Sequence, residues 1–298
     1  MIESVWTAQF NPMKNDIRVK GWSDLMEKLY AIPRTSFARY RSDFVYRGVA
    51  DRAWGLETSL RRLGGAYVEI EKPLLRSFRK YALPGSIPSK NLWFRLAVAQ
   101  HHGLPTRLLD WTVAPKVALH FATAETEHFD KDAAIWCIDV VRARELLPDA
   151  FVKLLKGEHA WLFDIEMLSP VKSLADFDLL AEQHGQFVVF FEPPSLDGRI
   201  VNQGAIMSAM PGAKCNLDHY LEQHPGLYHR FIIPKRLKWE VRDKLDQDNV
   251  TERMLFPGLD GLSRWLRRYY GPGPTKATAP NDSASRSMSR SAKGHRQP

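Results

Sequence analysis

The sequence predicts a single α+β domain, built from a mixed or antiparallel sheet flanked by helices. Of its 298 residues, 44% are hydrophobic and 26% are charged. This composition is typical of a globular domain, and the chain is long enough to bury a core without disulfides. Helical spacing is most frequent in the first half, whereas short β-branched and aromatic runs are more frequent in the second. Because the two kinds of segment do not alternate regularly, the pattern favours α+β over a parallel α/β fold.

Helices are expected where apolar residues recur every three or four positions. Ser23 is placed to cap the first helix, and Thr112 is placed to cap a later helix that has Pro115 in its first turn. Gly103 follows the end of another helix, at the position where glycine commonly stops one. The expected helices span residues 22–31, 67–81, 91–101, 114–122, 235–246 and 259–270.

Strands are expected in short runs that are rich in β-branched and aromatic residues. The last expected helix should close the domain by docking Leu262, Trp265 and Leu266 on the core formed by these strands. The expected strands span residues 43–49, 133–141, 186–192, 206–210 and 227–233.

The domain is expected to span residues 16–271, after a loosely held lead-in at residues 1–15. Glycine and proline alternate at residues 271–274, and Ser, Ala, Thr, Pro and basic residues follow. A segment with so few apolar groups cannot offset the loss of chain entropy, so residues 272–298 are predicted to be a disordered basic tail. This tail carries half of the formal net charge of +8.

The sequence favours a soluble protein of a reducing, cytoplasmic compartment, with no membrane association. Its two cysteines, Cys137 and Cys215, make neither a disulfide framework nor a zinc site. The first residues lack the basic and apolar regions of a signal peptide. No apolar run approaches the roughly 20 residues that span a bilayer.

The densest group of chemically active residues lies at residues 100–112, which we expect to form a loop between two helices. It contains two histidines, an arginine, an aspartate and a tryptophan, and such connections often carry function. His101 and His102 point about 100° apart on a helix, so they are not expected to share a metal ion. One of them could act as acid or base. The alternative is a structural turn in which Arg107 pairs with Asp110.

Arg47 is the second candidate, at the end of an expected strand and followed by Gly48. An arginine in this position can hold a phosphate or carboxylate through two parallel hydrogen bonds, and glycine allows close approach. The alternative is a buried ion pair with a carboxylate such as Asp110. A third candidate is Asn202-Gln203-Gly204, which offers amide groups before a short strand. No P-loop, GxSxG or GxGxxG motif is present.

These segments, in this order, resemble the FRG domain family. The resemblance rests on the aromatic-Arg-Gly motif at Tyr46-Arg47-Gly48, on the long motif at residues 100–112, and on residues 199–204 and 255–262. It covers roughly residues 20–270, and the long central motif is its specific part.

A weaker, fold-level resemblance is to ADP-ribosyltransferases, which carry an early-strand arginine, a Ser/Thr strand leading into a helix, and a late-strand glutamate. The resemblance implies that Arg47 holds the NAD diphosphate and that residues 110–112 shape the nicotinamide ribose site. Gln203 would occupy the late-strand position, where it supplies no negative charge. The resemblance therefore implies either that another carboxylate assists, with Asp110 and Glu192 as candidates, or that NAD is bound without transfer.

Two functions from different classes follow. The first is an NAD-using enzyme, either an ADP-ribosyltransferase or an NAD glycohydrolase, acting as a toxin or defence effector that a protein partner such as an antitoxin could control. The second is a non-catalytic domain that binds a nucleotide, nucleic acid or another ligand. No metal is expected. The catalytic candidates are Arg47, His102, Asp110 and Gln203, and the ligand-binding candidates are Tyr46, Gly48, Gln100, His101, Arg107, Trp111, Thr112, Arg199 and Asn202.

Overall fold

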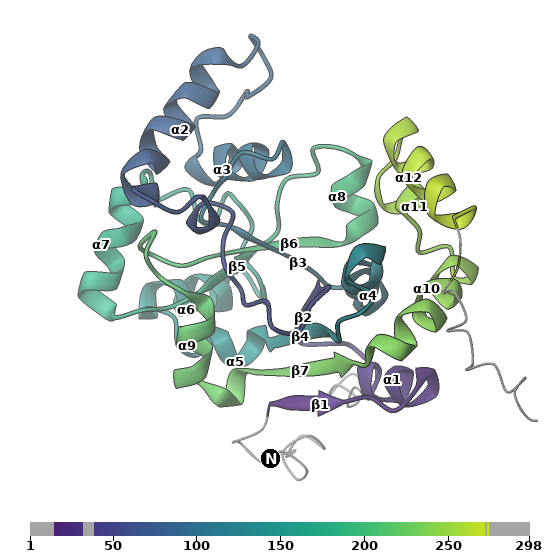
Figure 1. Ribbon diagram of the computed structural model, residues 1–298. Coiled ribbons are helices and arrows are strands. Elements are labelled where there is room, and N and C mark those ends of the chain that lie inside the picture. The colour runs from purple at the N-terminus through teal and green to yellow at the C-terminus, as the bar shows by residue number, and fades with distance from the viewer. Residues whose placement is uncertain (1–14, 32–38, 272, 274–298) are drawn as a thin grey trace, which may run out of the picture.

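The computed structural model describes residues 15–31, 39–271 and 273. In this part of the chain, seven strands form one mixed sheet in the order β1-β7-β4-β2-β3-β6-β5 (Figure 1). Strand β1 pairs with β7 in parallel, and every other neighbouring pair is antiparallel. The strands are β1 Asp16–Arg18, β2 Phe44–Val49, β3 Leu109–Thr112, β4 Ala133–Asp139, β5 Val189–Phe191, β6 Ala205–Ala209 and β7 Tyr228–Ile233.

Helices cover both faces of this sheet, so the expected α+β class with a mixed sheet is confirmed. None of the helices in the described part of the chain has the length and apolarity of a membrane span. The helices are α1 Trp22–Leu29, α2 Tyr67–Tyr81, α3 Leu92–His101, α4 Pro115–Thr123, α5 Val140–Arg144, α6 Asp149–Gly157, α7 Leu174–His184, α8 Gly198–Gln203, α9 Leu217–Gln223, α10 Lys238–Gln247, α11 Glu252–Leu255 and α12 Leu259–Tyr269.

The core lies on both faces because strand side chains alternate between them. Helices α1, α4 and α10 pack on the face that carries Tyr46 and Phe231. Helices α3 and α7 cover the β5–β6 end of the same face through Trp93 and Phe177, whose rings meet edge to face at 5.0 Å. Helices α5 and α9 cover the opposite face, which carries Trp111. The helix layer on the first face therefore has two groups, one at each end of the sheet.

Most expected elements form within a few residues of their predicted bounds. Helix α1 begins at Trp22 as expected, but Gly21, not Ser23, is its N-cap, and Asp24 accepts a hydrogen bond from the Lys20 amide. The N-cap of α4 is Ala114, although the Thr112 hydroxyl accepts the Ala114 amide at 3.0 Å.

The segments that were expected to lack regular structure differ most from the prediction. The expected loop at residues 100–112 ends in strand β3, and Asn202-Gln203 close the short helix α8. The expected docking of α12 through Leu266 is wrong, since this residue is 38% exposed. Helix α12 instead packs closely against the backbone of α11 and Phe256 through the buried Gly261, where an added Cβ would lie 1.8 Å from the Phe256 carbonyl oxygen. Residues 1–14 of the predicted lead-in and all but residue 273 of the predicted tail lie outside the described residues.

Candidate functional site

A cleft of about 880 Å³ opens where strands β2 and β3 diverge. The two strands are in register at one pair only, Tyr46 with Thr112, whereas β2 pairs with β4 along its whole length. Beyond that pair, residues 46–50 form one wall and residues 110–112 form another. The separation of two adjacent strands therefore creates the cleft inside the sheet.

Arg47 lies in this cleft, and no carboxylate in the described part of the chain is at hydrogen-bonding distance from it. Its Nη1 donates to the Asp110 backbone carbonyl at 2.6 Å, and its buried Nε has no partner within the described residues. Burial lowers the pKa of Arg47, the charge of Asp110 opposes that effect, and the positive charge of Arg62 lowers the pKa further. The alternative of a closed Arg47–Asp110 ion pair is therefore wrong, because the contact is with the peptide group.

The Asp110 carboxylate is exposed in the same cleft and is oriented by Gln100. Gln100 Nε2 donates to Asp110 Oδ2 at 2.9 Å, while Gln100 Oε1 accepts the Thr106 hydroxyl at 2.6 Å. This second bond fixes which end of the Gln100 amide faces the aspartate. The part of the long motif that precedes β3 thus positions a carboxylate beside a cationic side chain.

Gly48 brings helix α4 against strand β2. A Cβ added to Gly48 would lie 1.9 Å from the Ala118 carbonyl oxygen and 2.7 Å from the Ala122 nitrogen. Only glycine therefore permits this approach, which places Phe121 of α4 at the cleft. Tyr46, on the same face of the strand, is buried, and its hydroxyl lies 2.8 Å from Ser42 Oγ.

Helix α8 closes another side of the cleft with Arg199 and Gln203. The Thr112 hydroxyl donates to the Gln203 carbonyl at 2.5 Å, which joins α8 to β3. Gln203 Nε2 donates to the Leu255 carbonyl at 3.0 Å, and Asn202 Nδ2 donates to the Met254 carbonyl at 2.7 Å. Both amide side chains therefore hold α8 against α11. Gln203 ends a helix immediately before β6 and is not on a late strand, as the resemblance to transferases had implied.

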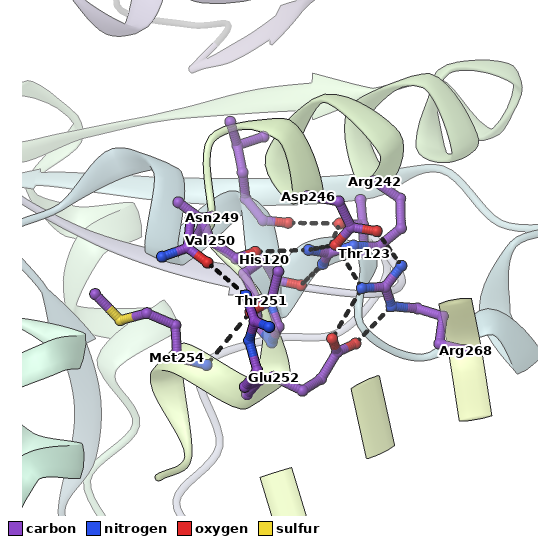
Figure 2. Close-up of polar contacts among 12 residues, drawn as sticks. His120, Thr123, Arg242, Asp246, Asn249, Val250, Thr251, Glu252, Met254 and Arg268 are labelled. Atoms are coloured by element: carbon purple, nitrogen blue, oxygen red, sulfur yellow. Dashed lines mark hydrogen bonds and ion pairs between the residues drawn. The ribbon is translucent and has the colours of Figure 1, made fainter. Parts of the chain in front are cut away.

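A buried network of charged residues holds α11 in place (Figure 2). Arg268 makes two hydrogen bonds to Glu252 of α11, at 2.7 and 2.9 Å, and two to Asp246 of α10, at 2.8 and 2.6 Å. Arg242, which is fully buried, donates to the Val250 carbonyl at 2.9 Å. The network thus ties α10, α11 and α12 together behind the cleft helix α8.

The cleft brings together ten of the thirteen candidate residues. The Trp111 indole within it donates to Ser208 at 2.8 Å, and His101 Nε2 lies 2.9 Å from Asp197 Oδ2. The ten are Tyr46, Arg47, Gly48, Gln100, His101, Asp110, Trp111, Thr112, Arg199 and Gln203.

His102, Arg107 and Asn202 do not line the cleft. His102 is exposed at the end of α3. Arg107 is buried and bonded to both oxygens of Glu71, at 2.7 and 2.6 Å, and to Asp178. Burial opposes the charge of Arg107, but these hydrogen bonds outweigh it and raise its pKa. Arg107 therefore organises the structure, and the alternative of a pair with Asp110 is wrong. Asn202 instead makes the bond to α11 described above.

Several cleft residues are not apparent from sequence reasoning. Arg62 belongs to a basic pair that is usually a solvated surface, and Trp54 lies in a polar turn without a motif. In the described part of the chain, no group of three or more His, Cys, Asp or Glu residues is arranged to hold a metal. The additional charged and aromatic residues of the cleft are Trp54, Glu57, Arg62, Phe121, Glu125 and Asp218.

Fold and site together define an α+β protein whose sheet separates around an arginine-containing cleft. Residues 42–131 match the family model of the FRG domain. The protein is therefore an FRG domain-containing protein. The matched segment includes the Tyr46-Arg47-Gly48 motif and the long motif at residues 100–112, whereas helix α8 lies outside it. No solved structure matches the chain.

Proposed function

We propose that the cleft binds the diphosphate of NAD and cleaves the bond between nicotinamide and ribose. The observation that carries this proposal is the Arg47 guanidinium, which lies in an 880 Å³ cleft and, among the residues that the structure describes, has neither a partner for its buried Nε nor a bonded carboxylate. A partly buried cation without a direct counterion favours an anionic ligand, because the ligand replaces the lost hydration of the charge.

The charges around Arg47 favour a diphosphate over a single carboxylate. Arg62 lines the same cleft and is close enough for its charge to affect the pKa of Arg47. Two neighbouring guanidinium groups can each form paired hydrogen bonds to phosphate oxygens. Arg199 adds a third positive charge at the α8 side of the cleft.

Asp110 supplies the negative charge that cleavage of the glycosidic bond requires. When that bond breaks, its electron pair leaves with nicotinamide and positive charge develops on the ribose ring, where a fixed carboxylate stabilises it. Asp110 can then accept a proton from the water that attacks the same carbon, which yields ADP-ribose. Glu192, the other candidate carboxylate, does not line the cleft. Gln203 can hydrogen-bond a ribose through its amide oxygen.

The test is incubation of the purified full chain with NAD, with nicotinamide release followed by chromatography. Wild-type protein should release nicotinamide. Arg47→Ala should weaken NAD binding about 10- to 100-fold, which corresponds to the loss of hydrogen bonds between charged groups. Asp110→Asn should retain binding and lose release. Expression in cells should deplete NAD and impair growth, as expected of a toxin or defence effector.

Arg267→Ala is the matched control, because Arg267 is exposed on α12 and does not line the cleft. It should behave as wild type in both assays. NAD binding without release, unchanged by Asp110→Asn, would assign the cleft to a non-catalytic nucleotide-binding domain. Failure to bind NAD at millimolar concentration would refute the proposal.

A further inference from the structure

We propose that Trp54 is the stacking platform for the planar base of the nucleotide whose phosphates Arg47 holds. This inference rests on the proposed nucleotide-binding function and adds the site for the base. Trp54 follows strand β2, lines the cleft, and is 42% exposed. A large aromatic side chain that remains exposed inside a cleft offers a flat apolar surface to a ligand ring.

The Trp54 ring is held in position by His128. The two rings meet edge to face, with centroids 4.8 Å apart and planes at 80°. His128 Nε2 in turn lies 3.4 Å from Glu125 Oε2, and Glu125 also lines the cleft. The indole therefore contacts the His128 ring while part of its surface remains exposed.

A buried lysine holds the backbone of the segment that carries Trp54. Lys238 of α10 is fully buried, and its Nζ donates to the carbonyls of Ala50 and His128, each at 2.6 Å. These carbonyls belong to the two segments that carry the edge-to-face pair of Trp54 and His128. Within the turn, the Trp54 amide donates to the Asp51 carbonyl at 3.0 Å. Such preorganisation lowers the entropy lost when a ligand ring docks.

The Trp54 base site and the phosphate site differ in the sign of the charge beside them. Glu125 places a negative charge beside the Trp54–His128 pair, which disfavours a phosphate there. Arg47 and Arg62 contribute positive charge to the lining of the same cleft. A nucleotide diphosphate therefore has a preferred orientation, with its base on Trp54 and its phosphates on the arginines.

The experiment compares ADP with inorganic pyrophosphate by isothermal titration calorimetry on the full chain. Trp54→Ala should weaken ADP binding about 5- to 140-fold, the range expected for one base stacked on an aromatic ring. The same variant should bind pyrophosphate as wild type does. Trp54→Phe should restore most of the ADP affinity, and Arg47→Ala should weaken binding of both ligands.

Trp161→Ala is the matched control, because Trp161 is 37% exposed and does not line the cleft. Its affinity for ADP should equal that of wild type. If Trp54→Ala binds ADP as wild type does while pyrophosphate binding still depends on Arg47, the stacking platform is refuted and the phosphate site stands. If neither ligand binds wild type, the proposed function and the platform are both refuted. Urea unfolding of Trp54→Ala verifies that the variant is folded.

Discussion

Replacing Arg268 with methionine should lower the free energy of unfolding by more than the loss of an exposed ion pair would. The substitution removes four hydrogen bonds, two to Glu252 and two to Asp246. Methionine retains much of the length and apolar volume of the side chain, so the principal change is the loss of charge. It leaves both carboxylates without Arg268, at a place where three helices meet (Figure 2).

The burial of the three side chains determines how much free energy of unfolding is lost. The side chains of Arg268, Asp246 and Glu252 are 7%, 14% and 8% exposed. An exposed ion pair contributes about 0–1 kcal/mol, whereas removing one partner of a buried pair costs about 3–5 kcal/mol. The larger range applies here, because the remaining carboxylates are shielded from water. Adding Glu252→Gln to Arg268→Met removes one of the two carboxylate charges that have lost Arg268 and should restore part of the loss.

Urea unfolding, monitored by tryptophan fluorescence, measures the difference in the free energy of unfolding between wild type and Arg268→Met. Arg267→Met is the control, since this neighbouring arginine is exposed, and it should stay within about 0.5 kcal/mol of wild type. A destabilisation below about 1 kcal/mol for Arg268→Met would refute the reasoning. So would a double variant whose loss equals the sum of the two single losses, because the two residues would then not interact.

Two further predictions concern the glycine contact and the acid dependence of stability. Gly48→Ala should cost about 3 kcal/mol or more in urea unfolding, because the new Cβ meets the backbone of α4 at 1.9 Å; a cost below 1 kcal/mol would contradict this close approach. Burial raises the pKa of Glu252, but hydrogen bonds from Arg268 outweigh burial and lower it to about 2 from 4.5. Its stabilising contribution is therefore complete above pH 4.5 and is lost as the pH falls toward 2, with about 2 kcal/mol lost by pH 3. Between pH 5 and 3, the free energy of unfolding of Glu252→Gln should depend less steeply on pH than that of wild type. Equal slopes for the two proteins would contradict a lowered pKa of Glu252.

Local signals explain why most helices were predictable. The Asn91 side chain accepts the Trp93 amide at the start of α3, and Gly103 beyond its end has a φ of 81°. Both features depend on a few neighbouring residues, so they can be identified in the sequence. The β-branched and aromatic content that marks the longer strands is similarly local.

Strand β3 and helix α8 were not predictable in the same way. Strand β3 has four residues and is positioned by its neighbours β2 and β6, which are distant in sequence. Tertiary pairing, not local propensity, therefore determines its conformation. Helix α8 has six residues, too few for a clear periodic pattern.

Side-chain contacts in the candidate site were also not predictable, because they join residues that are distant in sequence. The sequence indicates that Arg47, Arg107 and Asp110 matter, but it does not show how they pair. The carboxylates that bind Arg107 come from Glu71 and Asp178, 36 and 71 residues away. Arg47 contacts the peptide carbonyl of Asp110, a partner that no residue type reveals.

The divergence of β2 and β3 makes folding and occupancy of the cleft interdependent. Tyr46 and Thr112 form the one register pair that joins the β1-β7-β4-β2 half of the sheet to the β3-β6-β5 half. A ligand that contacts both walls bridges these halves in the folded state and has no equivalent site in the unfolded chain. At a hundred times its dissociation constant, such a ligand adds about 2.7 kcal/mol to the free energy of unfolding. A rise in melting temperature therefore identifies compounds that occupy the cleft, whatever reaction follows.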